Sequence, residues 1–218
     1  PPRDLTVTSC QPSEGKTTTA INLAVALAQL GRRVLVVDTD LRRPRCHQVL
    51  RTPATRGVST YLTGNADLRE LILPTSAERV FLLPAGPIPP NPAELLDADR
   101  FREFVASLRA SAEFDHMIYD SPPTLSVVDP LLIGRQTEGT ILVVKSAFTS
   151  RESGRLGKEK LLGGRVNLLG VLLNAVATEH VPYQYRYYRY GYAKKEGAGD
   201  GAPAREEVTT GADTARPA

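Results

Sequence analysis

The sequence has no tryptophan and only two cysteines, Cys10 and Cys46, among its 218 residues. Two cysteines are too few for a disulfide framework, and neither has a second Cys or His at the spacing of a metal-binding motif. These absences exclude a small domain held together by disulfides or by zinc. Because free thiols persist in reducing compartments, we expect both cysteines to be reduced and unpaired in a cytosolic protein.

Long hydrophobic runs are also missing. The longest uncharged apolar stretches, 20–31 and 166–176, have 12 and 11 residues, whereas a membrane-spanning helix needs roughly 18 or more. We therefore expect that this chain does not cross a membrane by itself. It begins at Pro1 without an initiator Met or a signal-peptide pattern, so we expect it to be a fragment of a longer product or a tagged chain from which the start was removed.

The chain has no strong net charge. Its 27 Lys and Arg residues outnumber its 24 Asp and Glu residues by only three, which excludes a global electrostatic drive toward nucleic acid or anionic lipid. Locally, residues 32–56 contain seven arginines and two aspartates. The side chains of Arg42, Arg43 and Arg45 are open to four interpretations: contact with phosphate, with a neighbouring subunit or with the anionic inner leaflet, or a solvated basic face.

The sequence does contain a regular alternation of short β-branched apolar runs and helix-length amphipathic segments. This alternation predicts an α/β fold with a mostly parallel sheet and helices on both faces. Several runs are continuously apolar, as is typical of strands buried on both faces. The expected strands are Leu5–Ser9, Val34–Asp38, Val80–Pro84, His116–Asp120, Thr140–Lys145 and Val166–Asn174, and the expected helices are 16–30, 93–111, 126–137 and 150–162.

The segment after the first expected strand has the composition of a phosphate-binding loop. Residues 9–19 read SCQPSEGKTTT. In a loop of this kind, backbone N–H groups at the N-terminus of the following helix surround a phosphate group. We expect Lys16 to reach the β- and γ-phosphates and the Thr17 hydroxyl to ligate Mg²⁺. Cys10 stands where the strict P-loop pattern has its first Gly, so a plain strand–helix turn with a solvated Lys16 is the alternative. The expected nucleotide-binding residues in this loop are Ser13, Glu14, Gly15, Lys16, Thr17 and Thr18.

Two other expected strands end in aspartate, within VVDTD at 36–40 and IYDSPP at 118–123. The carboxyl ends of parallel strands meet at the sheet edge where ligands bind, and carboxylates there hold Mg²⁺ directly or through water. One such aspartate is commonly only a cap for the next turn. Two of them after a phosphate loop predict a Mg²⁺-nucleotide site with Thr17, Asp40 and Asp120 as metal ligands.

The motifs taken together resemble the bacterial tyrosine kinases, the autokinases of capsule and exopolysaccharide synthesis that carry Walker A, A′ and B motifs. The resemblance covers about residues 3–195. It rests on SEGKTT at 13–18, VDTDLRRP at 37–44, NPAELL at 91–96, DSPP at 120–123 and a terminal tyrosine cluster.

The resemblance implies a P-loop-type kinase that uses ATP and Mg²⁺. It implies that Lys16 and Asp38 are catalytic, with Asp38 as the base that takes the tyrosine proton. Asn174 resembles the family's adenine-contacting Asn, with a strand-end turn residue as the alternative. The resemblance further implies a homo-oligomer, a membrane-spanning activator as a preceding region or separate chain, other protein substrates, no nucleic-acid partner, and a place at the inner face of the cell membrane.

Some residues depart from the family pattern. Ser13 stands where the family usually has Gly, and Cys10 where it has Ala or Gly. The family's oligomerisation motif, Glu-x-x-Arg-x-x-Arg, has no copy in the chain. The rival class is a partitioning or cell-division switch ATPase, but Gln11 stands where that class has a signature lysine. A catalytically silent export adaptor is the third class, and the intact set of acidic and basic site residues disfavours it.

Tyrosines are concentrated near the end of the chain. Without the ATP site this cluster would equally suit RNA stacking or a tail without chemistry; beside the site it predicts autophosphorylation, in trans. Residues 183–196 carry a local charge of +3, and each phosphotyrosine adds about −1.5 to −2, so two or three phosphates reverse its sign and would loosen assemblies. The expected phosphorylation sites are Tyr183, Tyr185, Tyr187, Tyr188, Tyr190 and Tyr192.

The expected domain organisation has three parts. Residues 1–180 form the P-loop ATP-binding kinase domain, 181–195 the tyrosine cluster and 196–218 a disordered tail. The length suits one domain plus a tail, and the last part has no hydrophobic periodicity.

Overall fold

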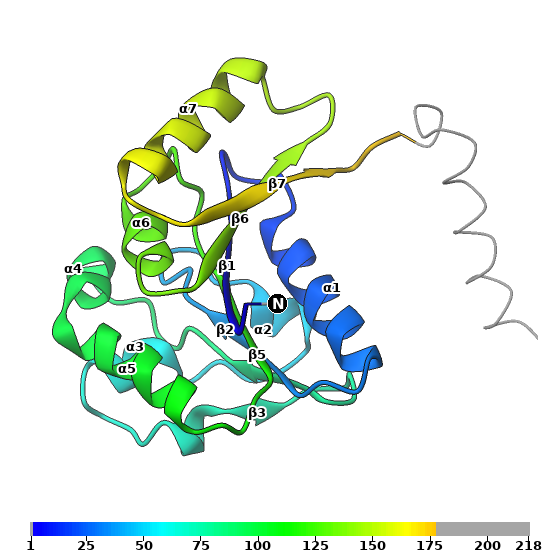
Figure 1. The fold of residues 1–218 in the computed structure, drawn as a ribbon. Helices are drawn as coiled ribbons and strands as arrows, with labels where there is room; N and C mark the ends of the chain where they lie inside the picture. Colours follow the sequence, from blue (N-terminus) through cyan, green and yellow to red (C-terminus); the bar gives the residue numbers. More distant parts are fainter. Residues whose placement is uncertain (1, 178–218) are drawn as a thin grey trace, which may run out of the picture. The chain divides into compact units, whose positions relative to one another are not determined.

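Seven strands form one sheet in the computed structural model, which describes residues 2–177 (Figure 1). The strand order is β3-β4-β2-β5-β1-β6-β7. All neighbouring strands run parallel except β3, which pairs antiparallel with β4. The strands are β1 (Asp4–Ser9), β2 (Val34–Asp38), β3 (Leu73–Pro74), β4 (Val80–Leu83), β5 (His116–Asp120), β6 (Gly139–Lys145) and β7 (Leu168–Asn174).

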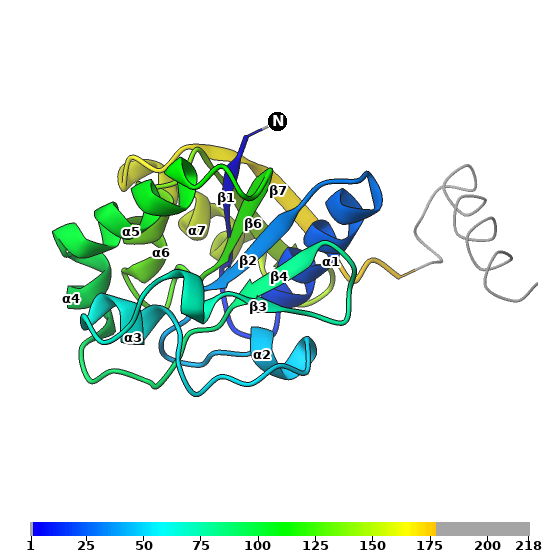
Figure 2. The ribbon, with the colours of Figure 1, turned by 90° about the horizontal axis from the view of Figure 1, so that it is seen from below.

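Helices cover both faces of the sheet, as Figure 2 shows. Within residues 2–177, no helix combines the length and the apolar composition needed to cross a membrane. The helices are α1 (Lys16–Gln29), α2 (Cys46–Val49), α3 (Val58–Leu62), η1 (Arg69–Leu71, a 3-10 turn), α4 (Pro92–Asp97), α5 (Asp99–Ala110), α6 (Asp129–Gly134) and α7 (Arg151–Gly163).

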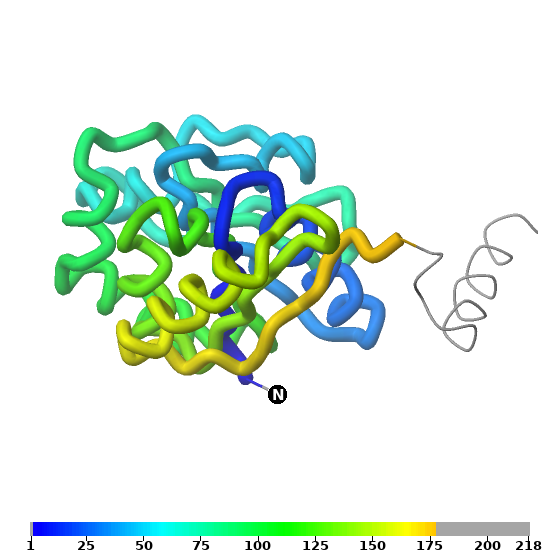
Figure 3. Tube along the Cα trace, turned by 90° about the horizontal axis from the view of Figure 1, so that it is seen from above, coloured from blue at the N-terminus to red at the C-terminus, as the bar shows by residue number. Residues whose placement is uncertain are grey.

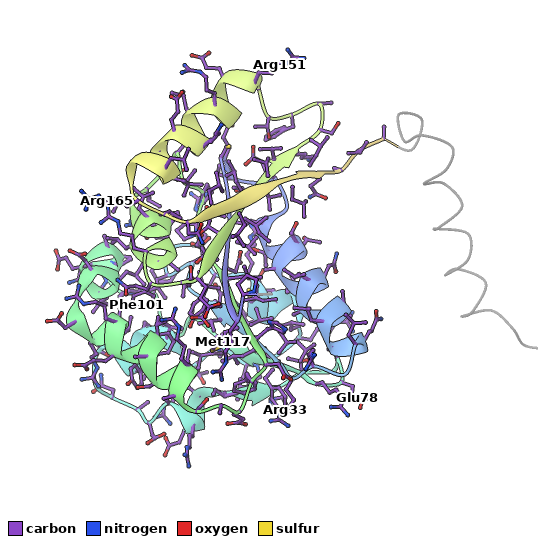
Figure 4. The ribbon with its side chains drawn as sticks, in the orientation of Figure 1. Arg33, Glu78, Phe101, Met117, Arg151 and Arg165 are labelled. Atoms are coloured by element: carbon purple, nitrogen blue, oxygen red, sulfur yellow. The ribbon has the colours of Figure 1, made fainter. Side chains whose placement is uncertain are left out.

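The core lies on both sides of the sheet. On one face, Ala20, Ala24 and Ala28 recur every four residues along α1, and all three are buried against the sheet. On the other face, Phe101 of α5 packs in one cluster with Met117 of β5, and both are labelled in Figure 4. Burial of large apolar side chains on both faces is the main stabilising contribution to such a sheet.

The predicted α/β class is confirmed, but several local predictions were wrong. The single helix expected over 93–111 is two helices, α4 and α5, because Ala98 adopts an extended conformation (φ −67°, ψ 154°) between them. The helix expected over 126–137 is confined to α6. The short elements α2, α3, η1 and β3 were not predicted, because they have too few residues to show a periodicity.

The last strand departs from the expectation of burial. β7 is an edge strand that pairs only with β6 among the described residues. Its side chains include Val171 and Leu173, which are 54% and 58% exposed. A continuous apolar run therefore identified the strand correctly, but it did not identify its position in the sheet.

All described residues up to Val176 belong to one compact unit. The tyrosine cluster expected at 181–195 and the tail expected at 196–218 lie outside the described residues, so the three-part domain organisation stays a prediction.

Candidate active site

The candidate site lies at the carboxyl ends of β1, β2 and β5, which are neighbours in the sheet. The backbone register pairs Asp120 of β5 with Val7 of β1 on one side and with Asp38 of β2 on the other. Thr39 fastens the two acid-bearing ends together, because its N–H and its Oγ1 both donate to the Asp120 carbonyl, at 2.9 and 2.8 Å. The strand order alone thus brings the phosphate loop and two aspartates to one edge.

A pocket of about 590 Å³ opens at this edge. Its walls come from the loop after β1 and the segment after β2, which lie close together in Figure 3, and from the segment after β5. The lining residues that the sequence predicted as site residues are Ser13, Gly15, Lys16, Thr17, Thr18 and Asp40.

The phosphate loop contains two residues in the left-handed backbone region. Ser13 has φ 68° and Gly15 has φ 96°. Gly15 is also the residue before α1, and its carbonyl accepts the N–H of Thr19 at 2.8 Å. Left-handed backbone is costly for an L-residue other than Gly, so the loop is strained at Ser13 and not at Gly15.

Two side chains outside the pocket support the phosphate loop. Glu14 is fully buried; it accepts the N–H of Gln11 at 2.7 Å and the hydroxyl of Thr149. Asn174, at the end of β7, donates from Nδ2 to the Glu14 carbonyl at 2.9 Å. Neither Glu14 nor Asn174 lines the pocket. Their side chains support the loop, so any contact of Glu14 with nucleotide would have to come from its backbone, and adenine contact by Asn174 stays a prediction.

Lys16 is the main cation of the site. Its Nζ lies 2.9 Å from Asp40 Oδ2 and 3.4 Å from Asp120 Oδ2. Burial opposes the charge on Lys16, yet attraction to Asp120 and Asp40 outweighs this effect, so the pKa of Lys16 is raised. The side chain is therefore a permanent positive charge that a bound phosphate would share with the two carboxylates.

Asp38 is fully buried next to Asp120. Burial, and secondly repulsion from Asp120, raises the pKa of Asp38 from 3.8 to about 7. The N–H groups of Cys46 and Asp40 donate to its two carboxylate oxygens at 3.0 and 3.3 Å and partly stabilise the charged form. A carboxyl group with a pKa near neutrality is suited to take up a proton at physiological pH.

The oxygen atoms predicted as Mg²⁺ ligands lie together. Thr17 Oγ1 donates to Asp120 Oδ2 at 2.6 Å, and Lys16 bridges Asp120 to Asp40. Burial raises the pKa of Asp120 even though Lys16 and the Thr17 hydroxyl favour its charged form. Hydroxyl and carboxylate oxygens are the donor set that Mg²⁺ prefers, so Thr17, Asp40 and Asp120 fit the ion.

Two features of the site were missed in the sequence. The Sγ of Cys46 lies 3.5 Å from Asp120 Oδ2, and Asp38, Cys46 and Asp120 offer ligand atoms within 4.8 Å of one another. Arg42 is not part of a solvated face: it donates from Nε and Nη2 to the buried Asp129 carboxylate, at 2.7 and 3.0 Å. No local pattern links these residues, because their partners lie far away in the sequence.

Three comparisons with known proteins bear on this geometry. The family model described as "AAA domain" matches residues 7–146. The tyrosine-protein kinase YwqD of Bacillus subtilis is 36% identical over 184 residues, which cover 84% of this chain and 77% of YwqD. The tyrosine-protein kinase Wzc of Salmonella typhimurium is 34% identical over 189 residues, 86% of this chain, but the chain spans only 26% of Wzc.

Solved structures give the same result. The kinase domain of the Escherichia coli tyrosine kinase ETK superposes with a TM-score of 0.77 at 32% identity, covering 83% of this chain and 70% of that one. The septum site-determining protein MinD of Pyrococcus horikoshii, complexed with Mg-ADP, has a TM-score of 0.67 at 27% identity, covering 84% and 75%. The family model matches residues 7–146, and the tyrosine kinase YwqD is 36% identical with 77% of its length covered, so the chain belongs to the bacterial tyrosine kinases.

Proposed function

We propose that this chain transfers the γ-phosphoryl group of ATP to protein tyrosine and that the tyrosine cluster, Tyr183 to Tyr192, is its principal acceptor. The observation that carries the proposal is Asp38, a buried carboxyl group with a pKa near 7, beside the cationic pocket at Lys16. A switch ATPase needs a nucleotide site and a Mg²⁺ site. A tyrosine kinase also needs a group that accepts the phenol proton, whose ordinary pKa is about 10.

The pocket residues have distinct roles in this proposal. The loop N–H groups from Ser13 to Thr18 hold the phosphates, and Lys16 stabilises the negative charge that develops on the β- and γ-phosphate oxygens. Thr17, Asp40 and Asp120 would hold Mg²⁺, which supplies further neutralisation of phosphate charge.

Proton uptake by Asp38 requires a rearrangement that opens this carboxyl group to the pocket. In the described structure Lys16 contacts Asp40 and Asp120, while Asp38 is fully buried and outside the pocket wall. A phosphate in the loop competes for Lys16 Nζ and draws it away from the carboxylates. A tyrosine hydroxyl then gains access to an Asp38 carboxylate oxygen, which takes the phenol proton. As it does so, the tyrosine oxygen bonds to the γ-phosphorus, the bond from this phosphorus to the β–γ bridging oxygen breaks, and ADP leaves.

The family assignment supports further parts of the proposal. The chain would act as a homo-oligomer, phosphorylate its neighbours in trans and regulate polysaccharide polymerisation or export. It would lie on the cytoplasmic side of the membrane, held there by a preceding region or a separate membrane-spanning activator. The likeness to MinD supports the second candidate, a switch ATPase, although Gln11 replaces the signature lysine of that class.

The test is to incubate the purified chain with labelled Mg²⁺-ATP and to map the label. A variant with all six cluster tyrosines changed to Phe keeps the length and charge of the chain and should lose the label. Truncation after Pro182 should have the same effect. Lys16→Met should abolish transfer without unfolding, whereas the control Lys158→Met, at an exposed position of α7, should leave it unchanged.

A concentration series separates the two routes of transfer. A rate per molecule that rises with concentration indicates transfer between molecules, and a constant rate indicates transfer within one. Release of free phosphate with no label on tyrosine at any concentration, also in the presence of a cognate activator segment, would replace the kinase proposal by the switch ATPase.

A further inference from the structure

Two arginines in the pocket wall have no counter-ion among residues 2–177. Arg43 and Arg45 both line the pocket, and both are exposed. Neither forms an ion pair with any residue in 2–177. The neighbouring Arg42 differs, because its guanidinium group is paired with Asp129. The two guanidinium groups are therefore available to an anion in the pocket.

The backbone that carries these arginines is fixed. Asp40 Oδ1 accepts the N–H of Arg43 at 3.0 Å and that of Arg42 at 3.4 Å. The next residue after Arg45, Cys46, donates its N–H to Asp38. The segment is thus tied at one end to Asp40, a candidate Mg²⁺ ligand, and at the other to Asp38, the candidate base. An anion bound by Arg43 and Arg45 would therefore lie at a set position relative to the reacting atoms.

The nucleotide has its own cations and donors elsewhere in the pocket. The phosphate loop, the N-terminus of α1 and Lys16 occupy one wall, while Arg43 and Arg45 belong to the segment after β2. The wall that follows β5 contributes only the uncharged residues Pro122, Pro123, Ser126 and Val127. The arginines therefore form a second cationic wall of the pocket, on a different segment of the chain from the phosphate loop.

The charge of the acceptor identifies the anion. Residues 183–192 contain two arginines and no acid, so the unmodified cluster is repelled by Arg43 and Arg45. A phosphotyrosine brings a charge of about −1.5 to −2 and three acceptor oxygens, which suit bidentate arginine contacts. In an extended segment, residues two apart point to the same side and are about 7 Å apart, which is the spacing of Tyr183, Tyr185 and Tyr187.

We propose that Arg43 and Arg45 form a phosphotyrosine subsite, so that a cluster already phosphorylated at one position is a better acceptor at the next. This inference rests on the proposed kinase function. It gives the Arg-rich stretch after the second strand a specificity role: the first phosphorylation of a cluster is slow, and each later one is favoured by the phosphate already present.

The test uses two peptides of residues 181–195 in which Tyr187 is the only acceptor. One peptide has phosphotyrosine at position 185, the other has Phe there, and all remaining tyrosines are Phe. The enzyme is the full chain with its own six cluster tyrosines changed to Phe, which removes self-labelling. We expect a KM about tenfold lower for the phosphorylated peptide, corresponding to about 1.4 kcal/mol, with a similar kcat, because the subsite binds ground and transition states alike.

Variants identify the subsite. Arg43→Gln/Arg45→Gln should reduce the ratio of kcat/KM between the two peptides to about one. The matched control, Arg69→Gln/Arg151→Gln, removes the same charge at two exposed positions outside the pocket and should keep the tenfold ratio. A measurement of ADP affinity for both variants distinguishes a phosphotyrosine subsite from a further contact to nucleotide.

Each outcome has a clear consequence. Equal use of the two peptides by the parent enzyme overturns the inference and leaves the proposed function intact. The same ratio in the Arg43/Arg45 variant also overturns it, as does a loss of ADP affinity confined to that variant, which would assign the arginines to the nucleotide. Failure to label either peptide overturns the kinase proposal and the subsite together.

Discussion

Gly15→Ala is the most informative single substitution, because it tests how β7 supports the phosphate loop. Gly15 has φ 96°, and a Cβ atom added there would lie 2.0 Å from Asn174 Nδ2 and 3.3 Å from its Cγ. The Asn174 amide would have to turn away, and its hydrogen bond to the Glu14 carbonyl would be lost. The substitution therefore strains the loop and removes its support at once.

The magnitude follows from two contributions. Left-handed backbone costs an L-residue about 1–2 kcal/mol, and the lost hydrogen bond about 1 kcal/mol. Gly31 provides the matched control, because it has φ 83° and no atom within 4 Å of an added Cβ. Gly31→Ala should thus lower the free energy of unfolding by about 1–2 kcal/mol, and Gly15→Ala by about 2–3 kcal/mol, from the same sources.

The assay is urea unfolding of both variants, of Asn174→Ala and of the double variant Gly15→Ala/Asn174→Ala. Once the Asn174 side chain is gone, Gly15→Ala should cost only the backbone strain, so the cycle should give a coupling of about 1 kcal/mol. ADP affinity should fall for Gly15→Ala and not for Gly31→Ala. Equal destabilisation at the two glycines with no coupling to Asn174 would refute the idea that β7 holds the loop.

Three further predictions concern charge and burial. Because the pKa of Asp38 is raised, the folded state keeps a proton that the unfolded state loses above pH 3.8, so the free energy of unfolding should fall as the pH rises toward 7. Asp38→Asn should flatten this slope when the free energy of unfolding is measured by urea titration between pH 5 and 7.5. An unchanged slope would contradict the assignment. Arg42→Met leaves the buried Asp129 carboxylate without its partner and should cost about 1–3 kcal/mol, the penalty of an unsatisfied buried acceptor, because the half-exposed arginine side chain leaves room for water. The exposed control Arg151→Met should cost at most about 0.5 kcal/mol, and similar costs for the two variants would show that the ion pair is dispensable. Both cysteines are free and buried, so a thiol reagent should react slowly with the native protein and count two thiols after unfolding without reductant; fewer than two would count against a reducing compartment.

The sequence by itself determined the parts of the site that depend on local chemistry. A loop rich in small and polar residues between a strand and a helix indicated where phosphate binds. Buried strands that end in Asp38 and Asp120 indicated which carboxylates meet it, because parallel strands place their carboxyl ends at one edge. These features are encoded within a few consecutive residues, so a linear reading recovers them.

Only the tertiary structure decided which neighbours tune those residues. The pKa of Asp38 depends on its burial beside Asp120, and the role of Asn174 depends on a contact with Glu14, 160 residues away in the chain. Arg42 and Asp129 are likewise 87 residues apart. Such pairs are set by strand order and helix packing, which leave no periodic signal in the sequence. The position of a strand in the sheet is also set by strand order, so an apolar run could not distinguish the exposed edge strand β7 from a central one.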